Sequence, residues 1–286
     1  MSDAAREGLA WITGAGGLIG GCLSALGGLP LWRTRGLARQ DLDLGDFRAV
    51  EGQFKRDRPA LVIHCAALTK TGECQAEPGR ARRLNVDVTA RLAELASDIR
   101  FIFFSTDLVF DGRSGHYDET ARVNPLSTYA ETKVAAENIV LANPRHTVVR
   151  TSLNGGVSRT GDRGFNELLR RAWQKGQMLD LYTDEFRSPV AAKVTARAVW
   201  ELAAANQPGL YHVAGSERLS RWEIGQALAK RWPQLKPNLR AASLKEYQGA
   251  PRAPDTSLNC AKAQRLLSFS LPGLTDWLAA NPDEEF

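Results

Sequence analysis

Short apolar runs alternate with amphipathic segments along the first half of the chain. The runs of strand length cover residues 9–13, 29–32, 61–65, 101–105 and 147–151. Between them, hydrophobic residues recur at helical spacing over residues 18–27, 46–58, 78–96 and 128–143. Apolar strands that alternate with amphipathic helices are typical of βαβ units, whose parallel sheet is buried on both faces. Because such crossovers are right-handed, the pattern predicts an α/β fold with a doubly wound parallel (Rossmann) sheet.

The pattern changes after residue 150. A segment rich in Gly, Ser, Thr and Arg at residues 154–164 predicts a loop at a lobe boundary. Helical spacing returns over residues 165–175, 191–205, 221–232 and 274–280, with short strands at 178–182 and 209–213. We expect a nucleotide-binding Rossmann domain over residues 1–152. Residues 153–286 are expected to form a smaller substrate-binding lobe, interleaved with the last elements of the Rossmann sheet.

Three glycines follow the first predicted strand at intervals of three residues. Gly14, Gly17 and Gly20 lie between that strand and the first predicted helix. Such glycines allow a tight turn and let the backbone approach a pyrophosphate, which the first N–H groups of the helix can then bind. The spacing predicts a dinucleotide site, with an ordinary βα turn as the alternative.

Two arginines stand where an NAD-binding protein of this kind usually carries an acidic residue for the ribose. Arg33 and Arg35 follow the predicted second strand, and no acidic residue precedes Asp41 in that region. Arginine there suits the 2′-phosphate of NADP. The alternative is that both are ordinary surface residues. NADP (as NADPH) is therefore the expected cofactor, and NAD stays open.

A tyrosine and a lysine share one face of the helix predicted over residues 128–143. Tyr129 and Lys133 are four residues apart, so a lysine ammonium lies one turn from the phenol and favours its ionised form. The fourth predicted strand ends in Ser105-Thr106-Asp107, at the edge where ligands of open α/β sheets bind. A Thr106 hydroxyl that orients a carbonyl and a Tyr129 that protonates it would form a carbonyl-reducing site.

Composition and charge narrow the class of protein. The 286 residues are 43% hydrophobic and 24% charged, with a net charge of +5, as in ordinary globular proteins. The basic run at residues 80–83 predicts a solvated helix face rather than a nucleic-acid site. The histidines and cysteines have no metal-ligand spacing, so no metal site is expected. No apolar run reaches the roughly 18 residues of a membrane span, and the N-terminus lacks a signal-peptide pattern, so we expect a cytoplasmic protein.

These residues resemble the extended short-chain dehydrogenase/reductase superfamily, and within it the dTDP-4-dehydrorhamnose reductase family. That family reduces the 4-keto group of a nucleotide-linked deoxysugar. The most specific mark is the Ser-Thr-Asp…Val-Phe-Asp-Gly string at residues 105–112. Further marks are found at residues 13–20, 64–69, 124–133, 150–152, 188–189, 209–215 and 251–254, so the resemblance covers nearly the whole chain.

The resemblance implies a role for each matching position. Tyr129 would be the proton donor, Lys133 its partner and Thr106 the hydroxyl that orients the carbonyl. The implied cofactor contacts are Gly17, Leu18 and Ile19 on the pyrophosphate, Asp43 and Leu44 beside adenine, and Ala66, Ala67 and Thr69 along the cofactor path. The implied substrate contacts are Asp107 beside the sugar, Leu153 at the sugar pocket, and Arg187 and Arg252 near the nucleotide diphosphate. For the two arginines, an ordinary surface charge is the alternative.

The chain also departs from the family at positions around the sugar. Leu108 replaces the usual Tyr, and Leu153 replaces the usual Trp. We expect an NADPH-preferring reductase of a nucleotide-activated 4-keto-6-deoxysugar. A reductase of a different small carbonyl compound, and a NADP-binding regulatory subunit without turnover, remain as alternatives. Homodimers are common in the superfamily, although no segment of this sequence identifies an interface. The acidic pair Asp184-Glu185 is interpreted as a solvated turn.

Overall fold

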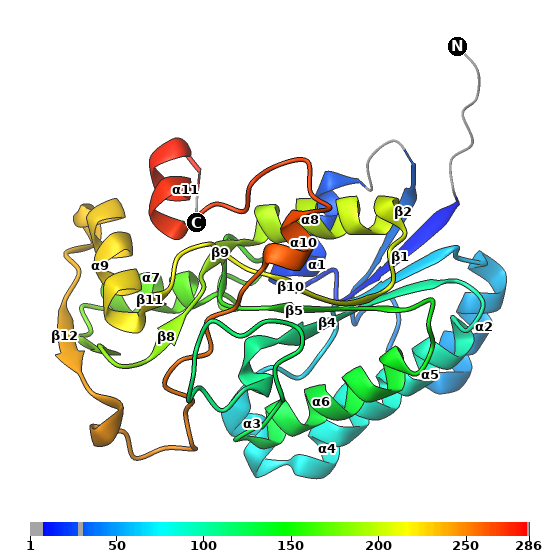
Figure 1. The fold of residues 1–286 in the computed structure, drawn as a ribbon, viewed down its shortest axis with the longest axis horizontal. Coiled ribbons are helices and arrows are strands. Elements are labelled where there is room, and N and C mark those ends of the chain that lie inside the picture. Colours follow the sequence, from blue (N-terminus) through cyan, green and yellow to red (C-terminus); the bar gives the residue numbers. More distant parts are fainter. Residues whose placement is uncertain (1–7, 28–30, 285) are drawn as a thin grey trace.

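A computed structural model describes residues 8–27, 31–284 and 286. Its centre is a six-stranded parallel sheet with the strand order β10-β5-β4-β3-β1-β2 (Figure 1). The strands are β1 (Leu9–Thr13), β2 (Arg33–Leu37), β3 (Leu61–His64), β4 (Arg100–Thr106), β5 (Thr147–Thr151) and β10 (Gly209–Val213). This order confirms the predicted Rossmann-like α/β class.

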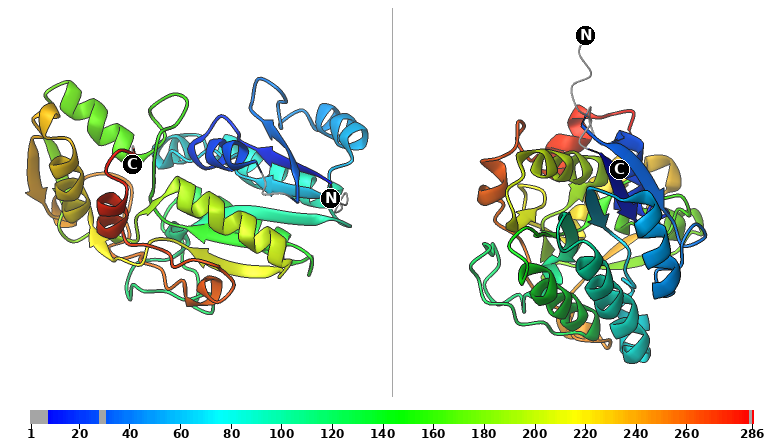
Figure 2. Two further views of the ribbon diagram at one scale, coloured as in Figure 1. Left: turned by 90° about the horizontal axis from the view of Figure 1, so that it is seen from above. Right: turned by 90° about the vertical axis from the view of Figure 1, so that its right-hand side faces the viewer.

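Successive strand residues face opposite sides of the sheet, and each side is covered by helices. Ile12 and Ile63 join one hydrophobic layer, whereas Trp11 and Val62 join the other. The first layer includes residues of α1 (Leu18–Leu26) and α8 (Ala192–Ala205). The second includes residues of α2 (Phe47–Asp57), α5 (Val88–Leu95) and α6 (Thr128–Leu141). Figure 2 shows these two helical layers on either side of the sheet. Burial on both faces explains why the strands are apolar runs in the sequence.

The second lobe packs around a separate hydrophobic cluster that contains Trp173, Ile224, Trp232 and Trp277. Its helices are α7 (Phe165–Gln174), α9 (Arg221–Arg231) and α11 (Leu274–Ala280). Three two-stranded sheets pair β6 (Asn154–Gly155) with β9 (Val190–Ala191), β7 (Leu179–Tyr182) with β12 (Leu239–Ala242), and β8 (Phe186–Arg187) with β11 (Leu219–Ser220). A short α10 (Ala261–Gln264) precedes α11. The lobe lies beyond the carboxyl ends of the central strands (Figure 1).

The chain returns from this lobe to complete the Rossmann sheet. β10 pairs in parallel with β5, with Tyr211 opposite Val149. α8, also from the second half of the chain, packs on α1, and the Trp200 indole N–H donates to the Leu23 carbonyl at 3.2 Å. The predicted boundary at residue 152 stays a prediction. The two halves of the sequence nevertheless share one sheet.

Two predicted elements differ from those in the structure. The second strand was expected over residues 29–32, of which 29 and 30 lie outside the described residues, but β2 covers Arg33–Leu37. β2 is an edge strand and largely exposed, so it has no apolar run to mark it. The single helix expected over 78–96 is divided into α4 (Pro78–Arg82), a π-helical turn η1 (Arg83–Asp87) and α5.

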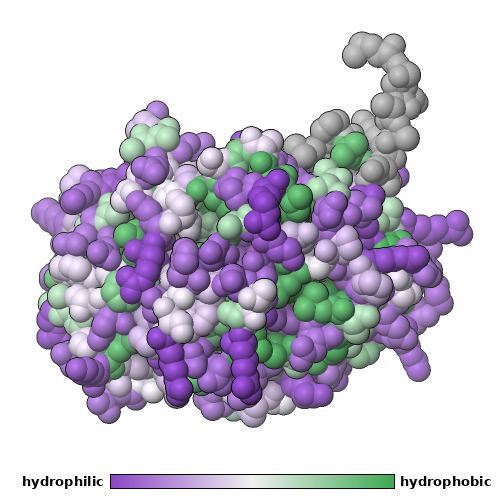
Figure 3. All heavy atoms as spheres, viewed as in Figure 1, coloured by the Kyte–Doolittle hydropathy of each residue, from purple (hydrophilic) through white to green (hydrophobic). Residues whose placement is uncertain are grey.

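The outer surface is predominantly polar on the face shown in Figure 3, where hydrophobic residues form scattered groups. None of the helices within residues 8–27, 31–284 and 286 combines the length and apolar character needed to span a membrane.

Candidate active site

The turn from β1 into α1 leaves room only for glycine at two positions, one in the loop and one in the first turn of the helix. Gly14 has a φ of +69°, and a Cβ there would lie 2.7 Å from the backbone nitrogen of Ala66. A Cβ on Gly20 would overlap the carbonyl oxygen of Gly14. The N–H groups of Leu18, Ile19 and Gly20 belong to the first turn of α1 and precede any acceptor within the helix. A close backbone approach with free donors fits a pyrophosphate.

Asn85 holds the loop that follows β3. Its Oδ1 accepts the Leu68 N–H at 2.7 Å, and its Nδ2 donates to the Leu68 carbonyl and to the Thr132 hydroxyl, both at 3.0 Å. The predicted cofactor residues Ala66, Ala67 and Thr69 lie on this loop, and Thr132 is on α6. Asn85 therefore joins the predicted cofactor path to the helix that carries Tyr129 and Lys133. Sequence reasoning assigned it no role, since charged residues stand two positions away on either side and no local pattern marks it as buried.

The predicted catalytic residues come together at the carboxyl edge of the sheet. Thr106 ends β4, and Tyr129 and Lys133 lie on α6, where the Ser127 hydroxyl caps the helix by accepting the Ala130 N–H. Thr106 and Tyr129 are each 8% exposed and Lys133 is 3% exposed. Thr106 acts on the Tyr129 phenol, whose pKa it lowers. The Nζ of Lys133 lies 4.0 Å from the centroid of the Phe103 ring, which is also on β4.

The environment holds Tyr129 in its protonated form. Burial, followed by Asp107 and Cys74, raises the pKa of Tyr129, while Thr106 and Arg187 lower it without reversing the shift. Arg187 is the cation among these main influences on the phenol. Burial also lowers the pKa of Lys133 to about 7, although Glu137 and Cys65 act in the opposite direction.

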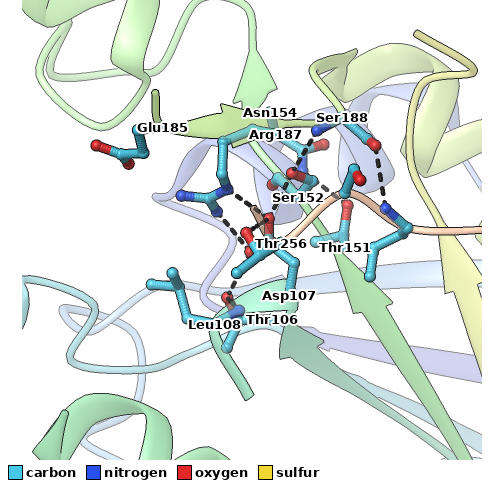
Figure 4. A network of polar contacts seen from close by, with 12 residues as sticks. Thr106, Asp107, Leu108, Thr151, Ser152, Asn154, Glu185, Arg187, Ser188 and Thr256 are labelled. Atoms are coloured by element: carbon cyan, nitrogen blue, oxygen red, sulfur yellow. Dashed lines mark hydrogen bonds and ion pairs between the residues drawn. The ribbon is translucent and has the colours of Figure 1, made fainter. Parts of the chain in front are cut away.

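Asp107 lies at the centre of a buried polar network (Figure 4). The guanidinium of Arg187, on β8, makes two hydrogen bonds to its carboxylate, each 2.5 Å long. The hydroxyls of Ser152 and Thr256 donate to the same carboxylate at 2.5 and 3.1 Å. The structure therefore brings the predicted substrate residues Asp107 and Arg187 together as an ion pair that links the end of β4 to the second lobe.

Arg252, also predicted to contact substrate, belongs to a second ion-pair cluster. It donates to Glu185 at 2.7 Å, and Arg221 donates to the other oxygen of Glu185 at 2.9 Å. Burial alone would raise the pKa of Glu185, but Arg221, Arg252 and Arg187 outweigh it and lower that pKa. Interpreting Glu185 as part of a solvated turn was wrong, because its side chain is only 5% exposed. Tyr247 stacks on Arg252, with its ring centroid 4.6 Å from the guanidinium carbon.

The two leucines that replace family aromatics have different neighbours. Leu108 and Leu68 pack against a cluster that contains Tyr129 and Cys74. Leu153 packs against the hydrophobic cluster of the second lobe, and its carbonyl accepts the Val190 N–H at 2.9 Å. Leu108 thus contributes an apolar wall beside Tyr129, whereas Leu153 anchors the start of the second lobe.

The Arg35 side chain pairs with a residue outside the glycine loop. Its guanidinium pairs with Asp57 at 2.6 Å, as does the indole N–H of Trp11 at 2.8 Å. Asp57 ends α2 and precedes the start of β3, so this pair lies at the amino edge of the sheet. The glycine loop is at the opposite, carboxyl edge. Arg33 is exposed on the same edge strand, two residues before Arg35.

A different group of arginines lies at the carboxyl end of β2. Arg39, Arg48, Arg80 and Arg83 line a cavity of about 580 Å³, here called the arginine groove, together with Asp43 and Leu84. Ala38, the residue before Arg39, adjoins the glycine loop, since a Cβ on Gly16 would lie 3.6 Å from its side chain. The other acidic residue of the groove, Asp46, is engaged in capping α2. The predicted adenine neighbour Asp43 therefore lies among arginines that follow β2, rather than beside Arg33 and Arg35.

Fold and site define a dinucleotide-binding α/β protein with a Thr/Tyr/Lys constellation at the carboxyl edge of its sheet. The chain belongs to the RmlD substrate binding domain family, whose model matches residues 10–282. It is 30% identical to a dTDP-4-dehydrorhamnose reductase from Sinorhizobium fredii, over 82% of this chain and 84% of that protein. It is also 28% identical to the methionine adenosyltransferase 2 subunit beta of Xenopus laevis, over 90% of this chain and 82% of that protein.

The fold agrees with that of a solved relative. A dTDP-4-dehydrorhamnose reductase from Bacillus anthracis, in complex with NADP, superposes with a TM-score of 0.87 and 24% sequence identity. The match covers 96% of this chain and 98% of the other.

Proposed function

We propose that this chain is an NADPH-preferring reductase that acts on the 4-keto group of a nucleotide-activated 6-deoxysugar. The observation that carries the proposal is the position of Thr106, Tyr129 and Lys133, which lie buried together at the carboxyl edge of the sheet. The glycine cradle that fits a pyrophosphate lies at the same edge. The similarity to named dTDP-sugar reductases supports this choice of substrate class.

Each residue of the site has a distinct role in this proposal. NADPH, when bound, supplies the hydride. Thr106 donates a hydrogen bond to the carbonyl oxygen of the substrate, and Tyr129 passes its phenol proton to the same oxygen. Burial keeps that proton on Tyr129 until the oxygen becomes basic enough to take it. Lys133 and the loop held by Asn85 bind the nicotinamide ribose, and the N–H groups of Leu18, Ile19 and Gly20 bind the pyrophosphate.

The direct test is to mix the purified chain with NADPH and dTDP-4-keto-6-deoxyglucose and to follow the loss of NADPH absorbance. We expect saturable turnover and a dTDP-6-deoxyhexose product that lacks the keto group. If another small carbonyl compound were turned over and the dTDP-sugar were not, the proposed reductase activity would stand and the proposed substrate would be wrong.

A regulatory role is the second candidate, because the chain also matches methionine adenosyltransferase 2 subunit beta over most of its length. A subunit that only binds NADP needs no proton donor beside the cofactor, whereas this chain keeps Thr106, Tyr129 and Lys133 together. Tight binding of NADPH with no consumption in the presence of any dTDP-sugar would favour the regulatory role.

The arginine groove gives a prediction about cofactor preference. If it holds the 2′-phosphate of NADP, Arg39→Ala should raise the Kd for NADPH roughly tenfold, or about 1.4 kcal/mol, and leave the Kd for NADH nearly unchanged. Arg35→Ala is the matched control, since that side chain pairs with Asp57 at the other edge of the sheet. Fluorescence titration with both cofactors measures the two constants. A selective loss of NADPH affinity in Arg35→Ala instead would place the 2′-phosphate at Arg33 and Arg35.

A further inference from the structure

The carboxylate of Asp107 has its hydrogen-bonding capacity filled by groups other than a substrate. Arg187 donates to both oxygens, and Ser152 and Thr256 donate to Oδ2. Three of these four donors are on Oδ2 and one is on Oδ1, which leaves one lone-pair position of Oδ1 for a fifth donor within the protein. The Asp107 side chain is 0% exposed and that of Arg187 is 6% exposed. Asp107 is therefore unsuited to binding a sugar hydroxyl directly, although the resemblance places it beside the sugar.

One further donor to Asp107 is weakly held. The Thr106 hydroxyl donates to Oδ1 at 3.2 Å, well beyond the usual separation of about 2.7–2.8 Å for hydrogen bonds between oxygens. The same Thr106 oxygen accepts the Leu108 N–H at 3.2 Å. Of the five hydrogen bonds to Asp107, those from Thr106 and Thr256 are the longest, at 3.2 and 3.1 Å.

The single proton of the Thr106 hydroxyl has two possible acceptors during the proposed reaction. A threonine hydroxyl can donate only one hydrogen bond at a time. While it donates to Asp107, it cannot donate to the carbonyl oxygen of a substrate. An unpaired buried carboxylate would hold this proton strongly, because water is excluded and few other donors are available. A carboxylate whose charge is compensated by Arg187 holds the Thr106 proton less strongly.

We propose that Arg187 is a positioning residue of the reductase site: by compensating the charge of Asp107 and donating to both of its oxygens, it frees the Thr106 hydroxyl to donate to the substrate carbonyl. This inference rests on the proposed reductase function. It adds that the Asp107–Arg187 pair acts through Thr106 and does not bind the sugar. The same pair joins β4 to β8, so it also couples the approach of the second lobe to the orientation of this hydroxyl.

The charges around the pair agree with this role. On the side of the second lobe, Glu185 stands two residues before Arg187 and is already neutralised by Arg221 and Arg252. On the side of the Rossmann domain, Asp107 is one of the charges that act on Tyr129. Arg187 is therefore the cation that compensates Asp107 within the network, and its removal leaves a buried negative charge bonded to the Thr106 hydroxyl.

The test is a set of variants assayed by NADPH consumption with dTDP-4-keto-6-deoxyglucose. Arg187→Gln keeps amide donors and removes the charge, and we expect kcat/KM to fall roughly 10²-fold, the loss typical of one missing oxyanion donor. Thr106→Val should lose a similar factor. Because both changes remove the same hydrogen bond, the Thr106→Val/Arg187→Gln double variant should be little worse than either single variant. Adding Asp107→Asn to Arg187→Gln should restore most of the activity.

A matched control is available on the protein surface. Arg240 makes the same two-point contact with Asp180, at 2.7 and 2.6 Å, but that pair is solvent-exposed. Arg240→Gln should leave kcat/KM unchanged. Arg187→Lys keeps the charge with fewer fixed donors, so its kcat/KM should lie between those of the wild type and Arg187→Gln. This variant keeps the proposal testable if Arg187→Gln does not fold.

The alternative outcomes separate the two proposals. Suppose that the wild type turns over the substrate. If the losses of the two single variants then multiply fully in the double variant, or if Asp107→Asn does not restore activity, the role of Arg187 is overturned and the reductase function stands. Unchanged activity in Arg187→Gln would do the same. A wild-type chain that consumes no NADPH with this substrate would instead refute the proposed function, and the inference with it.

Discussion

Tyr129→Phe is expected to lower kcat by roughly 10²- to 10⁴-fold, the usual contribution of a positioned general acid. The substitution removes the phenol proton but keeps the ring that packs among Leu68, Leu108 and Cys74. The fold and the NADPH affinity should therefore stay close to those of the wild type. Steady-state kinetics with a dTDP-4-keto-6-deoxysugar measures the first quantity, and NADPH fluorescence titration measures the second.

A second buried tyrosine provides the control. Tyr211 is 4% exposed and lies on β10, in the hydrophobic layer beneath α8. Tyr211→Phe also deletes a buried phenol hydroxyl, but outside the site, so its kcat should be near the wild-type value. If Tyr129→Phe retained full turnover, the phenol would not be the proton donor, and the proposed mechanism would fail whatever the substrate.

Glu137→Ala should lower the free energy of unfolding by about 3–5 kcal/mol, the range for a buried ion pair that loses one partner. The Glu137 carboxylate accepts from Arg150 at 2.9 and 2.7 Å, and the two side chains are only 3% and 5% exposed. Without Glu137, the guanidinium stays buried beside Phe110 and His212 with its main counter-charge gone. Chemical denaturation monitored by circular dichroism measures the change.

The same helix supplies the comparison for this prediction. Glu131→Ala removes an exposed carboxylate from the first turn of α6 and should change the free energy of unfolding by no more than about 0.5 kcal/mol. Equal losses in the two variants would mean that helix propensity, and not the pair with Arg150, accounts for the effect.

The fold was predictable because burial on both faces leaves a strong sequence pattern. Five of the six central strands appear as apolar runs or regular alternations, and the helices between them keep their spacing. β2 was not predicted at its actual position because an exposed edge strand need not be apolar. Its Arg35 is paired with Asp57, which is distant in the sequence. The π-helical turn at Arg83–Asp87 also left no periodic signal, since one widened turn hardly disturbs the spacing of the apolar residues.

The site was only partly predictable, for a different physical reason. Thr106, Tyr129 and Lys133 could be placed because strand ends and helix faces follow from local patterns. The contact between Asp107 and Arg187 joins residues that are 80 positions apart, in a segment without strong periodicity. From the sequence alone, a charged residue such as Glu185 is predicted to be solvent-exposed, because the residues that form ion pairs with it are not known. The groups that surround an active site are therefore harder to predict than the groups that react.

The return of the chain to form β10 has a consequence for how the protein can be made and altered. Until residues 209–213 have left the ribosome, β5 is an unpaired edge rich in valine, a surface prone to join other strands. A fragment that ends at the lobe boundary would carry this exposed edge permanently. Exchanging the second lobe with that of a relative would accordingly need two junctions, one on each side of a retained Gly209–Val213. The substrate specificity could then be changed while the central sheet stays complete.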